Sequence, residues 1–195
     1  MPTLERGFKA WAERTASAVR VELGLTPTQP FDPHRLASHL EIRIINPLVD
    51  LPGLGPDILT QLFERDPWGW SAATLQIENR AIIIYNPKKS KGRQTSDLIH
   101  ELAHVVLGHE PAQMVFSQDG QIATRTFNQA QEDEANWLGW ALLLPREALV
   151  AARRSRMANA QIAEAYGVTE RLVGYRVQMT GVDVQFGRRR MARGA

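Results

Sequence analysis

The feature that most constrains this chain is the segment HELAH at residues 100–104, which matches the pattern HExxH within a stretch of helical periodicity. Two histidines four residues apart project from the same face of a helix, so both imidazoles can bind one metal ion. The neighbouring apolar residues form a separate stripe that would anchor the helix against a core. This context favours a metal site over a helix whose histidines are merely exposed.

The composition restricts how such a metal could be held. The chain has 195 residues and no cysteine, which excludes a disulfide scaffold, an iron–sulfur cluster and a thiolate zinc finger. An ion bound by His100 and His104 therefore needs a histidine, aspartate or glutamate as its third protein ligand. Zinc suits imidazole nitrogens and lowers the pKa of a bound water molecule, and Glu101 is placed to accept the proton.

An acidic segment downstream supplies candidates for the third ligand. Residues 131–136 read QEDEAN and lead into the almost wholly apolar run WLGWALLLP, which predicts a buried helix at residues 129–144. Acidic residues at the start of a helix can simply complement its dipole. Glu132 precedes Asn136 by one turn, so Asn136 can serve as a hydrogen-bonding partner of the site. Glu134 is the competing ligand, and the pattern leaves both glutamates open.

Periodicity and turn signals predict a chain of mixed helices and strands. The first predicted helix ends at Gly24 and has apolar positions at Phe8, Trp11, Ala12, Thr15, Val19 and Leu23. Strands are expected at residues 42–45, 71–77 and 80–85. Further helices are expected at residues 33–40, 57–65, 96–107, 129–144 and 146–156, with loops at residues 46–56 and 88–94. The pattern assigns no element to residues 110–128.

Residues 159–180 have the spacing of a compact helix-turn-helix unit, with Gly167 in the turn and Thr169 as the N-cap of the second helix. A helix that reads DNA usually begins with basic or amide side chains, whereas this helix begins with Glu170 and Arg171. We therefore expect the unit to support the rest of the fold, and docking of DNA or of a protein partner is the alternative.

Charge and hydropathy set further expectations. Residues 185–195 hold four of the 23 basic side chains and no acidic one, so we expect a flexible basic tail after a single domain at residues 1–184. The N-terminal residues carry charges throughout, and no segment approaches the roughly 20 apolar residues of a membrane span. These features favour a cytoplasmic protein without a membrane partner.

Three segments carry a resemblance to a known family: HELAHVVLGHE at residues 100–110, QEDEANWLGWALLLP at residues 131–145 and IAEAYGVTERLVGYRVQMTG at residues 162–181. Together they resemble the ImmA/IrrE family of zinc metallopeptidases, and the resemblance extends over residues 8–182. It implies an α+β, zincin-like metallopeptidase domain. In such a domain a small β-sheet packs beside the HExxH helix, and here a helix-turn-helix-like segment follows.

The resemblance also implies roles for individual residues. His100, His104 and Glu132 correspond to the ligands of one zinc ion per chain, and Glu101 corresponds to the general base. Similar peptidases often have aspartate where this chain has Asn136, so weaker tuning of a ligand histidine is expected. The donor that stabilises the oxyanion stays open among four side chains: Tyr85, His109, Tyr175 and Arg176. Of these, His109 is expected beside the site rather than on the metal.

Members of this family cleave helix-turn-helix repressors and so relieve transcription of a mobile element or a stress regulon. The resemblance thus implies a zinc endopeptidase whose substrate is a transcriptional repressor on another polypeptide. The strand at residues 80–85 is expected to present an edge to which the substrate adds as an extra strand. Three alternatives remain: a DNA-binding regulator with structural zinc, a protein that sequesters the repressor without cutting it, and a zinc hydrolase of non-peptide amides.

Overall fold

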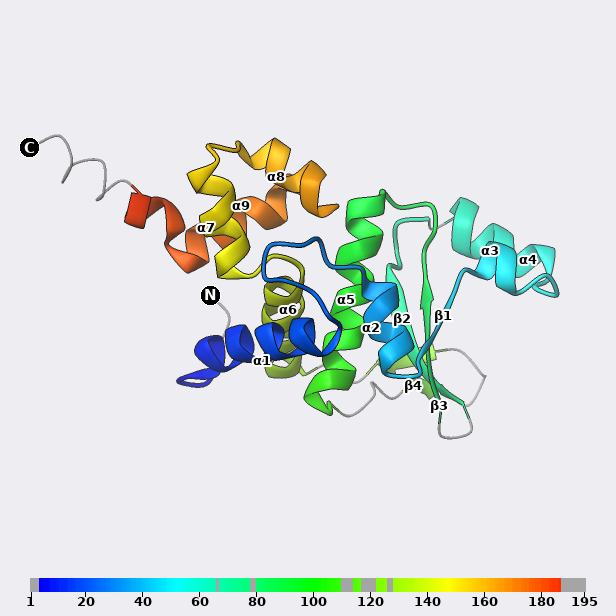
Figure 1. Cartoon of the computed structure of the whole chain (residues 1–195). Coiled ribbons are helices and arrows are strands. Elements are labelled where there is room, and N and C mark those ends of the chain that lie inside the picture. The colour runs from blue at the N-terminus through cyan, green and yellow to red at the C-terminus, as the bar shows by residue number, and fades with distance from the viewer. Residues whose placement is uncertain are drawn as a thin grey trace, which may run out of the picture.

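The protein is an α+β fold in which one central helix separates a small sheet from a group of helices. The computed structural model describes residues 4–65, 67–77, 80–109, 114–116, 122–125 and 128–186. Helix α5 (Lys91–Leu107) lies in the middle, with the sheet on one side and α6 (Gln129–Leu143) on the other (Figure 1). Because α5 carries the HExxH segment, the site lies between the sheet and α6.

The two N-terminal helices follow the predicted pattern closely. Helix α1 (Phe8–Glu22) packs on α6, and Gly24 follows it with a left-handed φ of 67°. Helix α2 (Pro33–His39) packs on α5, and the Asp32 side chain caps it by accepting a hydrogen bond from the backbone N–H of His34. The buried face of α1 differs from the predicted one, because Trp11 is exposed and Arg20 is buried.

The sheet has three strands in the order β1-β3-β2. Strand β1 (Arg43–Ile45) runs parallel to β3 (Arg80–Tyr85), and β2 (Ala72–Ile77) runs antiparallel to it, with Thr74 opposite Ile83. The expectation that residues 80–85 present an edge is wrong, because β3 pairs on both sides and occupies the centre. Among the described strands, β2 pairs on one side only, and its other edge faces α5. Glu78 and Asn79, which separate the two predicted strands, lie outside the described residues.

Residues 46–65 are more helical than predicted. The expected loop contains a short helix, α3 (Pro47–Asp50), because the Asn46 side chain accepts a hydrogen bond from Leu48 and Pro47 occupies the first turn. The predicted helix at residues 57–65 divides into α4 (Pro56–Thr60) and a π-helical turn, η1 (Gln61–Arg65).

Helix α5 begins before its predicted start at residue 96. Of the predicted loop at residues 88–94, residues 91–94 instead form the first turn of the helix, and Gly92 lies against the α8–α9 turn. A Cβ on Gly92 would lie 3.0 Å from the backbone of Val168, so only glycine fits there without movement. After α5, strands β4 (Met114–Phe116) and β5 (Ile122–Arg125) form a separate antiparallel pair that the sequence pattern missed.

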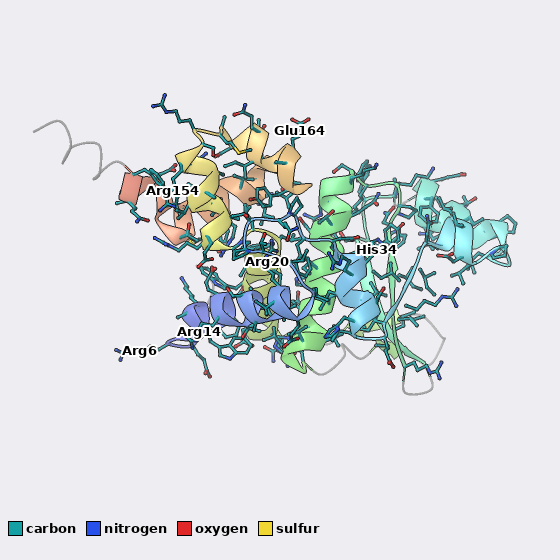
Figure 2. All side chains as sticks on the ribbon, viewed as in Figure 1. Arg6, Arg14, Arg20, His34, Arg154 and Glu164 are labelled. Carbon is teal, nitrogen blue, oxygen red and sulfur yellow. The ribbon has the colours of Figure 1, made fainter. Side chains whose placement is uncertain are left out.

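Two buried arginines hold the C-terminal end of α6. Arg20 of α1 donates to the carbonyl oxygen of Leu142 at 2.6 Å and also to the carbonyl of Gln29. Arg176 donates to the carbonyl oxygen of Leu144 at 3.0 Å. Both side chains are only 1% exposed. Figure 2 places Arg20 inside the fold, whereas Arg6 and Arg14 point to solvent. Burial lowers the pKa of Arg20.

The C-terminal helices are α7 (Arg146–Arg154), α8 (Asn159–Tyr166) and α9 (Glu170–Thr180). The last two form the predicted helix-turn-helix, with Gly167 at a φ of 63° and the Thr169 side chain accepting from Leu172. The unit packs on the body, since the Tyr166 hydroxyl donates to the carbonyl of Thr28. Of the predicted tail, residues 187–195 lie outside the described part of the chain. Within the described part, no helix has the length and apolar character to cross a membrane.

Candidate metal centre

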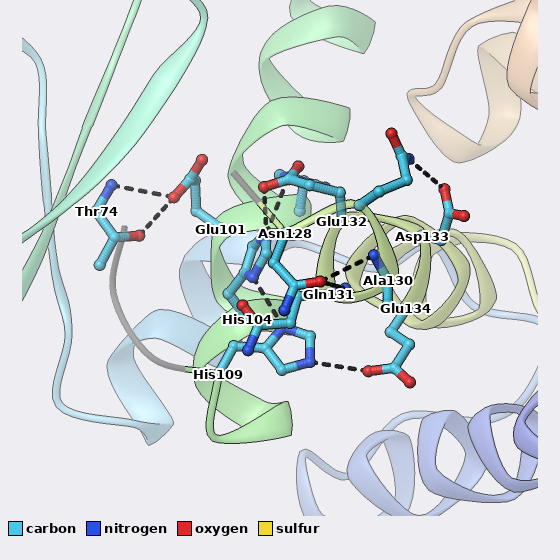
Figure 3. Close-up of polar contacts among 12 residues, drawn as sticks. Thr74, Glu101, His104, His109, Asn128, Ala130, Gln131, Glu132, Asp133 and Glu134 are labelled. Carbon is cyan, nitrogen blue, oxygen red and sulfur yellow. Dashed lines mark hydrogen bonds and ion pairs between the residues drawn. The ribbon is translucent and has the colours of Figure 1, made fainter. Parts of the chain in front are cut away.

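One face of α5 and the first turn of α6 bring together two imidazoles and a carboxylate (Figure 3). The Nε2 atom of His100 lies 3.1 Å from Oε2 of Glu132, and Nε2 of His104 lies 3.6 Å from Oε1 of the same glutamate. The two Nε2 atoms are 3.2 Å apart. Residues from segments about thirty positions apart in sequence thus converge on one point.

These three side chains fit a metal ion. Their ligand atoms all lie within 4.8 Å of one another. Two ligands of a tetrahedral zinc ion with bonds of about 2.0–2.1 Å stand about 3.3 Å apart, and the observed separations bracket that value. The group His100, His104 and Glu132 can therefore hold a metal ion, and two nitrogens with one oxygen suit zinc.

The structure separates the two glutamates that the sequence left open. Glu132 faces both histidines of the HExxH segment, whereas Oε2 of Glu134 lies 3.1 Å from Nε2 of His109. Asp133 points away from both contacts and accepts a hydrogen bond from the Gln129 side chain at 2.9 Å. Three consecutive acidic side chains thus have three different partners, because a helix turns by about 100° per residue.

The two histidines differ in the partners of their Nδ1 atoms, which lie on the side of each ring away from Glu132. Nδ1 of His104 is 2.9 Å from Nδ1 of His109, which continues the contact to Glu134. Nδ1 of His100 is buried and has no hydrogen-bond partner among the described residues. Asn136, expected as a partner of the site, lines the same cavity as His100. Among the described residues its side chain makes no hydrogen bond with either histidine, so its role as a partner of the site stays a prediction.

Glu101 is held by the edge of the sheet. Its Oε2 atom accepts two hydrogen bonds from Thr74, one from the backbone N–H at 3.0 Å and one from the hydroxyl at 2.6 Å. The Glu101 side chain is 5% exposed. The backbone contact shows that the N–H of Thr74 points away from β3 and toward α5. Thr74 has no sequence signal of its own, since only the fold reveals that β2 lies over Glu101.

A cavity of about 520 Å³ opens beside these residues. The segment of residues 69–73 forms one wall, and α5 and α6 form the others through Asp97, His100, Glu132 and Trp140. Burial raises the pKa of the Asp97 carboxyl, and Arg93, whose Nε lies 2.9 Å away, partly opposes that shift. The cavity is thus a groove with acidic and aromatic walls, bounded by an edge of β2 that pairs with no other strand in the described part of the chain.

The four candidates for an oxyanion donor lie in different places. The expectation that Arg176 is an oxyanion donor is wrong. Its guanidinium is buried against Leu144 and Glu13, at the far end of α6 from Glu132. Tyr85 packs against the core at the end of β3 and does not line the cavity. His109 is engaged by His104 and Glu134. Tyr175 does not line the cavity, but its ring packs on Trp140, which does, with centroids 4.6 Å apart.

Three further aromatic side chains, Tyr175, Trp70 and Trp68, lie in or near the segments that form the groove. Burial raises the pKa of Tyr175, Asp133 raises it further, and Arg176 opposes the shift, so the phenol keeps its proton at neutral pH. Trp70 lines the cavity, packs on Phe63 and donates to the carbonyl of Leu62. Trp68, two residues earlier, is 73% exposed.

Comparisons with known proteins identify a similar fold and a family. A Mycobacterium tuberculosis transcriptional regulator has a similar structure, with a TM-score of 0.52 and 14% sequence identity over 86% of this chain. The chain spans 46% of that regulator, and at this identity the similarity concerns the fold alone. No curated protein matches the chain in sequence. A family model described as the IrrE N-terminal-like domain, Peptidase_M78, matches residues 61–178 and thus more than half of the chain. The matched residues include α5, α6 and every side chain of the candidate metal centre, and the chain therefore belongs to the IrrE N-terminal-like Peptidase_M78 family.

Proposed function

We propose that this protein is a zinc-dependent endopeptidase that cleaves one specific protein, a helix-turn-helix transcriptional repressor. The observation that carries the proposal is the position of Glu101. It lies beside the group His100, His104 and Glu132, and it also lies beneath the unpaired edge of β2. A carboxylate between a metal-binding group and a strand edge is where a general base for peptide hydrolysis is needed.

The strand edge supports the peptide part of the proposal. In an antiparallel pair, alternate residues direct their N–H and C=O groups away from the partner strand. Thr74 directs its N–H away from β3, and Ala72, two residues earlier, shares that orientation and lines the cavity. An extended substrate segment can therefore pair with Ala72 and lie along the groove.

The proton transfers fall to Glu101. A zinc ion held by the three ligands would polarise the scissile carbonyl and lower the pKa of a water molecule. Both hydrogen bonds from Thr74 fall on Oε2 of Glu101, so Oε1 is the atom we expect to accept the proton. Glu101 would then pass this proton to the leaving amine. The Tyr175 hydroxyl is our candidate for the donor to the developing oxyanion.

We also propose that residues 1–184 act as a single domain in which α8 and α9 support the site. Arg176 of α9 contacts both Glu13 of α1 and the carbonyl of Leu144 after α6. The apolar side chains of the unit are buried, among them Ile162, Leu172 and Val173. These contacts support a structural role for the unit rather than docking of DNA.

The identity of the target rests on the family resemblance. The first test of the proposal is the metal content of the purified protein by elemental analysis. We expect about one zinc ion per wild-type chain, and we expect its loss in His104→Ala and in Glu132→Ala. Glu164→Ala is the matched control, because Glu164 is an exposed glutamate of α8 outside the group that binds the metal. Absence of any transition metal from wild type after zinc is supplied would contradict the proposal.

The second test is cleavage of a helix-turn-helix repressor encoded beside this protein. We expect zinc-loaded wild type to produce two discrete fragments and Glu101→Gln to retain zinc and produce none. A regulator that acts without proteolysis is the second candidate function, because the similar M. tuberculosis protein is a transcriptional regulator. Such a regulator would bind the repressor equally well with Glu101→Gln and leave it intact in both cases.

A further inference from the structure

We propose that His109 and Glu134 are positioning residues that fix the tautomer and the orientation of His104 as a metal ligand. This inference rests on the proposed function, because it assigns a role to residues behind the same site. Neither residue belongs to the group that can hold the metal, which comprises His100, His104 and Glu132. His109 and Glu134 form a second layer on the side of His104 that faces away from Glu132.

The backbone at the end of α5 brings His109 to this position. Gly108 ends the helix in the left-handed conformation, with a φ of 66°, and the chain turns back there. The backbone N–H of His109 consequently donates to the carbonyl oxygen of His104 at 3.0 Å. The same turn places the two Nδ1 atoms 2.9 Å apart. The His109 side chain is only 8% exposed, so water does not readily replace these contacts.

The positions of the protons follow from the chemistry of the chain of contacts. An ionised Glu134 can only accept a hydrogen bond, so Nε2 of His109 carries a proton and donates it. A neutral His109 then has a lone pair on Nδ1, which accepts a hydrogen bond from Nδ1–H of His104. His104 therefore keeps its lone pair on Nε2, the atom that faces Glu132 and His100. The chain of contacts selects the tautomer that binds a metal.

A comparison of His100 with His104 indicates what the contacts of His109 and Glu134 contribute. Its Nε2 atom also faces Glu132, but its buried Nδ1 atom has no partner among the described residues. Asn136 lines the same cavity but makes no hydrogen bond with this ring in the described structure. The carboxylate that orients a ligand histidine in many zinc sites is thus Glu134 here, and it acts through a second imidazole.

His109 is poorly placed to be a ligand itself. Both of its ring nitrogens are engaged, Nδ1 by His104 and Nε2 by Glu134. The group that can hold a metal contains neither His109 nor Glu134. Loss of either residue should therefore weaken the binding of zinc without removing a ligand.

The test measures the zinc dissociation constant of the full chain by competition with a chromophoric chelator. We expect His109→Leu to weaken zinc binding by about 10–100-fold. His109→Asn should recover most of this loss, because the amide oxygen can occupy the position of Nδ1 and accept from His104. Glu134→Gln should fall between the two. His39→Leu is the matched control, because His39 pairs with Glu22 at 3.7 Å on the surface, so its removal should leave zinc binding unchanged.

A second measurement does not depend on any variant folding. Long-range nitrogen–proton correlation spectra of zinc-loaded wild type report which ring nitrogen of each of the five histidines carries a proton. We expect His109 to be protonated on Nε2 alone, with its ring assigned through the backbone resonances of wild type. Protonation of His109 on Nδ1, or on both nitrogens, would overturn the inference. So would zinc binding by folded His109→Leu that equals the wild-type value. Failure of wild type to bind zinc would instead overturn the proposed function, and the inference with it.

Discussion

The two ends of α6 have opposite characters. The first two turns carry Glu132 and Glu134, which are partly exposed and lie against histidine side chains. The C-terminal turn is fully buried, and its carbonyl oxygens are held by the guanidinium groups of Arg20 and Arg176. Carboxylates at the N-terminus and cations at the C-terminus both complement the helix dipole. The same electrostatic preference thus serves a candidate site at one end and the stability of the fold at the other.

This difference between the two ends of α6 indicates how the position of a polar site on a helix can be fixed. The turn that carries Glu132 is only partly buried, so packing alone does not fix it. The opposite end is locked by buried charge-assisted hydrogen bonds, and a helix transmits that position along its length, here about 18 Å from residue 132 to residue 144. We therefore expect substitutions at the buried end to lower stability and substitutions at the polar end to affect metal binding and catalysis.

The largest effect that separates the two ends is expected from Arg20→Met. Removal of the guanidinium leaves the buried carbonyl of Leu142 without its donor, which should lower the free energy of unfolding by about 3 kcal/mol. Urea denaturation of the metal-free protein measures this change. Arg35→Met is the matched control, because Arg35 donates to the carbonyl of Leu23 at 2.5 Å in an exposed position. Equal losses in the two variants would show that burial of Arg20 does not matter.

Gly139→Ala tests whether the two ends of α6 are coupled through its middle. A Cβ on Gly139 would lie 3.2 Å from the carbonyl oxygen of Ile99, where α6 crosses α5. Separation of the helices should lower the free energy of unfolding by about 1–3 kcal/mol. It should also weaken zinc binding, because His100 and Glu132 lie on the two helices that separate. Thermal unfolding and chelator competition measure the two effects.

Gly174→Ala is the control for this prediction. Gly174 lies inside α9, and a Cβ there would find its nearest neighbour at 3.9 Å. Alanine should therefore stabilise the protein slightly, by up to about 1 kcal/mol. If Gly139→Ala raised stability as Gly174→Ala does, the proposed close approach of α5 and α6 would be wrong.

Thr74 of β2 allows a test of the side of the site opposite α6, because it holds Glu101 of α5. Thr74→Val removes the hydroxyl that donates to Glu101 and keeps the shape of the side chain. The rate of repressor cleavage should fall by about tenfold, because a hydrogen bond to a charged group contributes about 1.5 kcal/mol or more. Zinc content should not change. Thr74→Ser keeps the hydroxyl and should restore most of the rate, so a slow Thr74→Ser enzyme would argue against this contact.

The smallest expected effect is a pH dependence of the free energy of unfolding, caused by Asp97, which lines the groove together with Glu132. Burial gives Asp97 a higher pKa in the folded chain than in the unfolded chain. Its contribution to stability is thus fully present below an unfolded pKa of about 3.9, and it is lost as the pH rises through the folded pKa. Asp97→Asn should therefore gain stability relative to wild type between about pH 4 and pH 7. Urea denaturation of metal-free protein at both pH values measures the difference, and a change in the opposite direction would contradict the assignment.

Much of the fold could be predicted because local signals coincide with it. Apolar periodicity and stop residues located α1, α2, α6 and the pair α8–α9, and alternation located β2 and β3. The HExxH spacing identified His100, Glu101 and His104 as candidates because i and i+4 share a face of any helix. These features depend on neighbours in sequence, which a single chain reveals.

The rest depends on contacts between distant segments. Nothing local marks Arg20 as buried or distinguishes it from the exposed arginines of α1, since the carbonyl of Leu142 that it binds lies 122 residues away. The same holds for Arg176, whose partner is the end of α6 rather than a substrate. Strand order is also non-local, which is why β2 rather than β3 forms the edge above Glu101. Strands β4 and β5 are too short for alternation to be recognised.

The unpaired edge of β2 has a consequence for the target of the proposed peptidase. Only extended backbone can pair with a strand edge, so a helical segment of a repressor would have to unravel over several residues before it could enter the groove. The rate of cleavage would then follow how often the target opens locally, rather than its affinity alone. A ligand or a stress that loosens one helix of the repressor would act as the trigger, with no change in the peptidase itself.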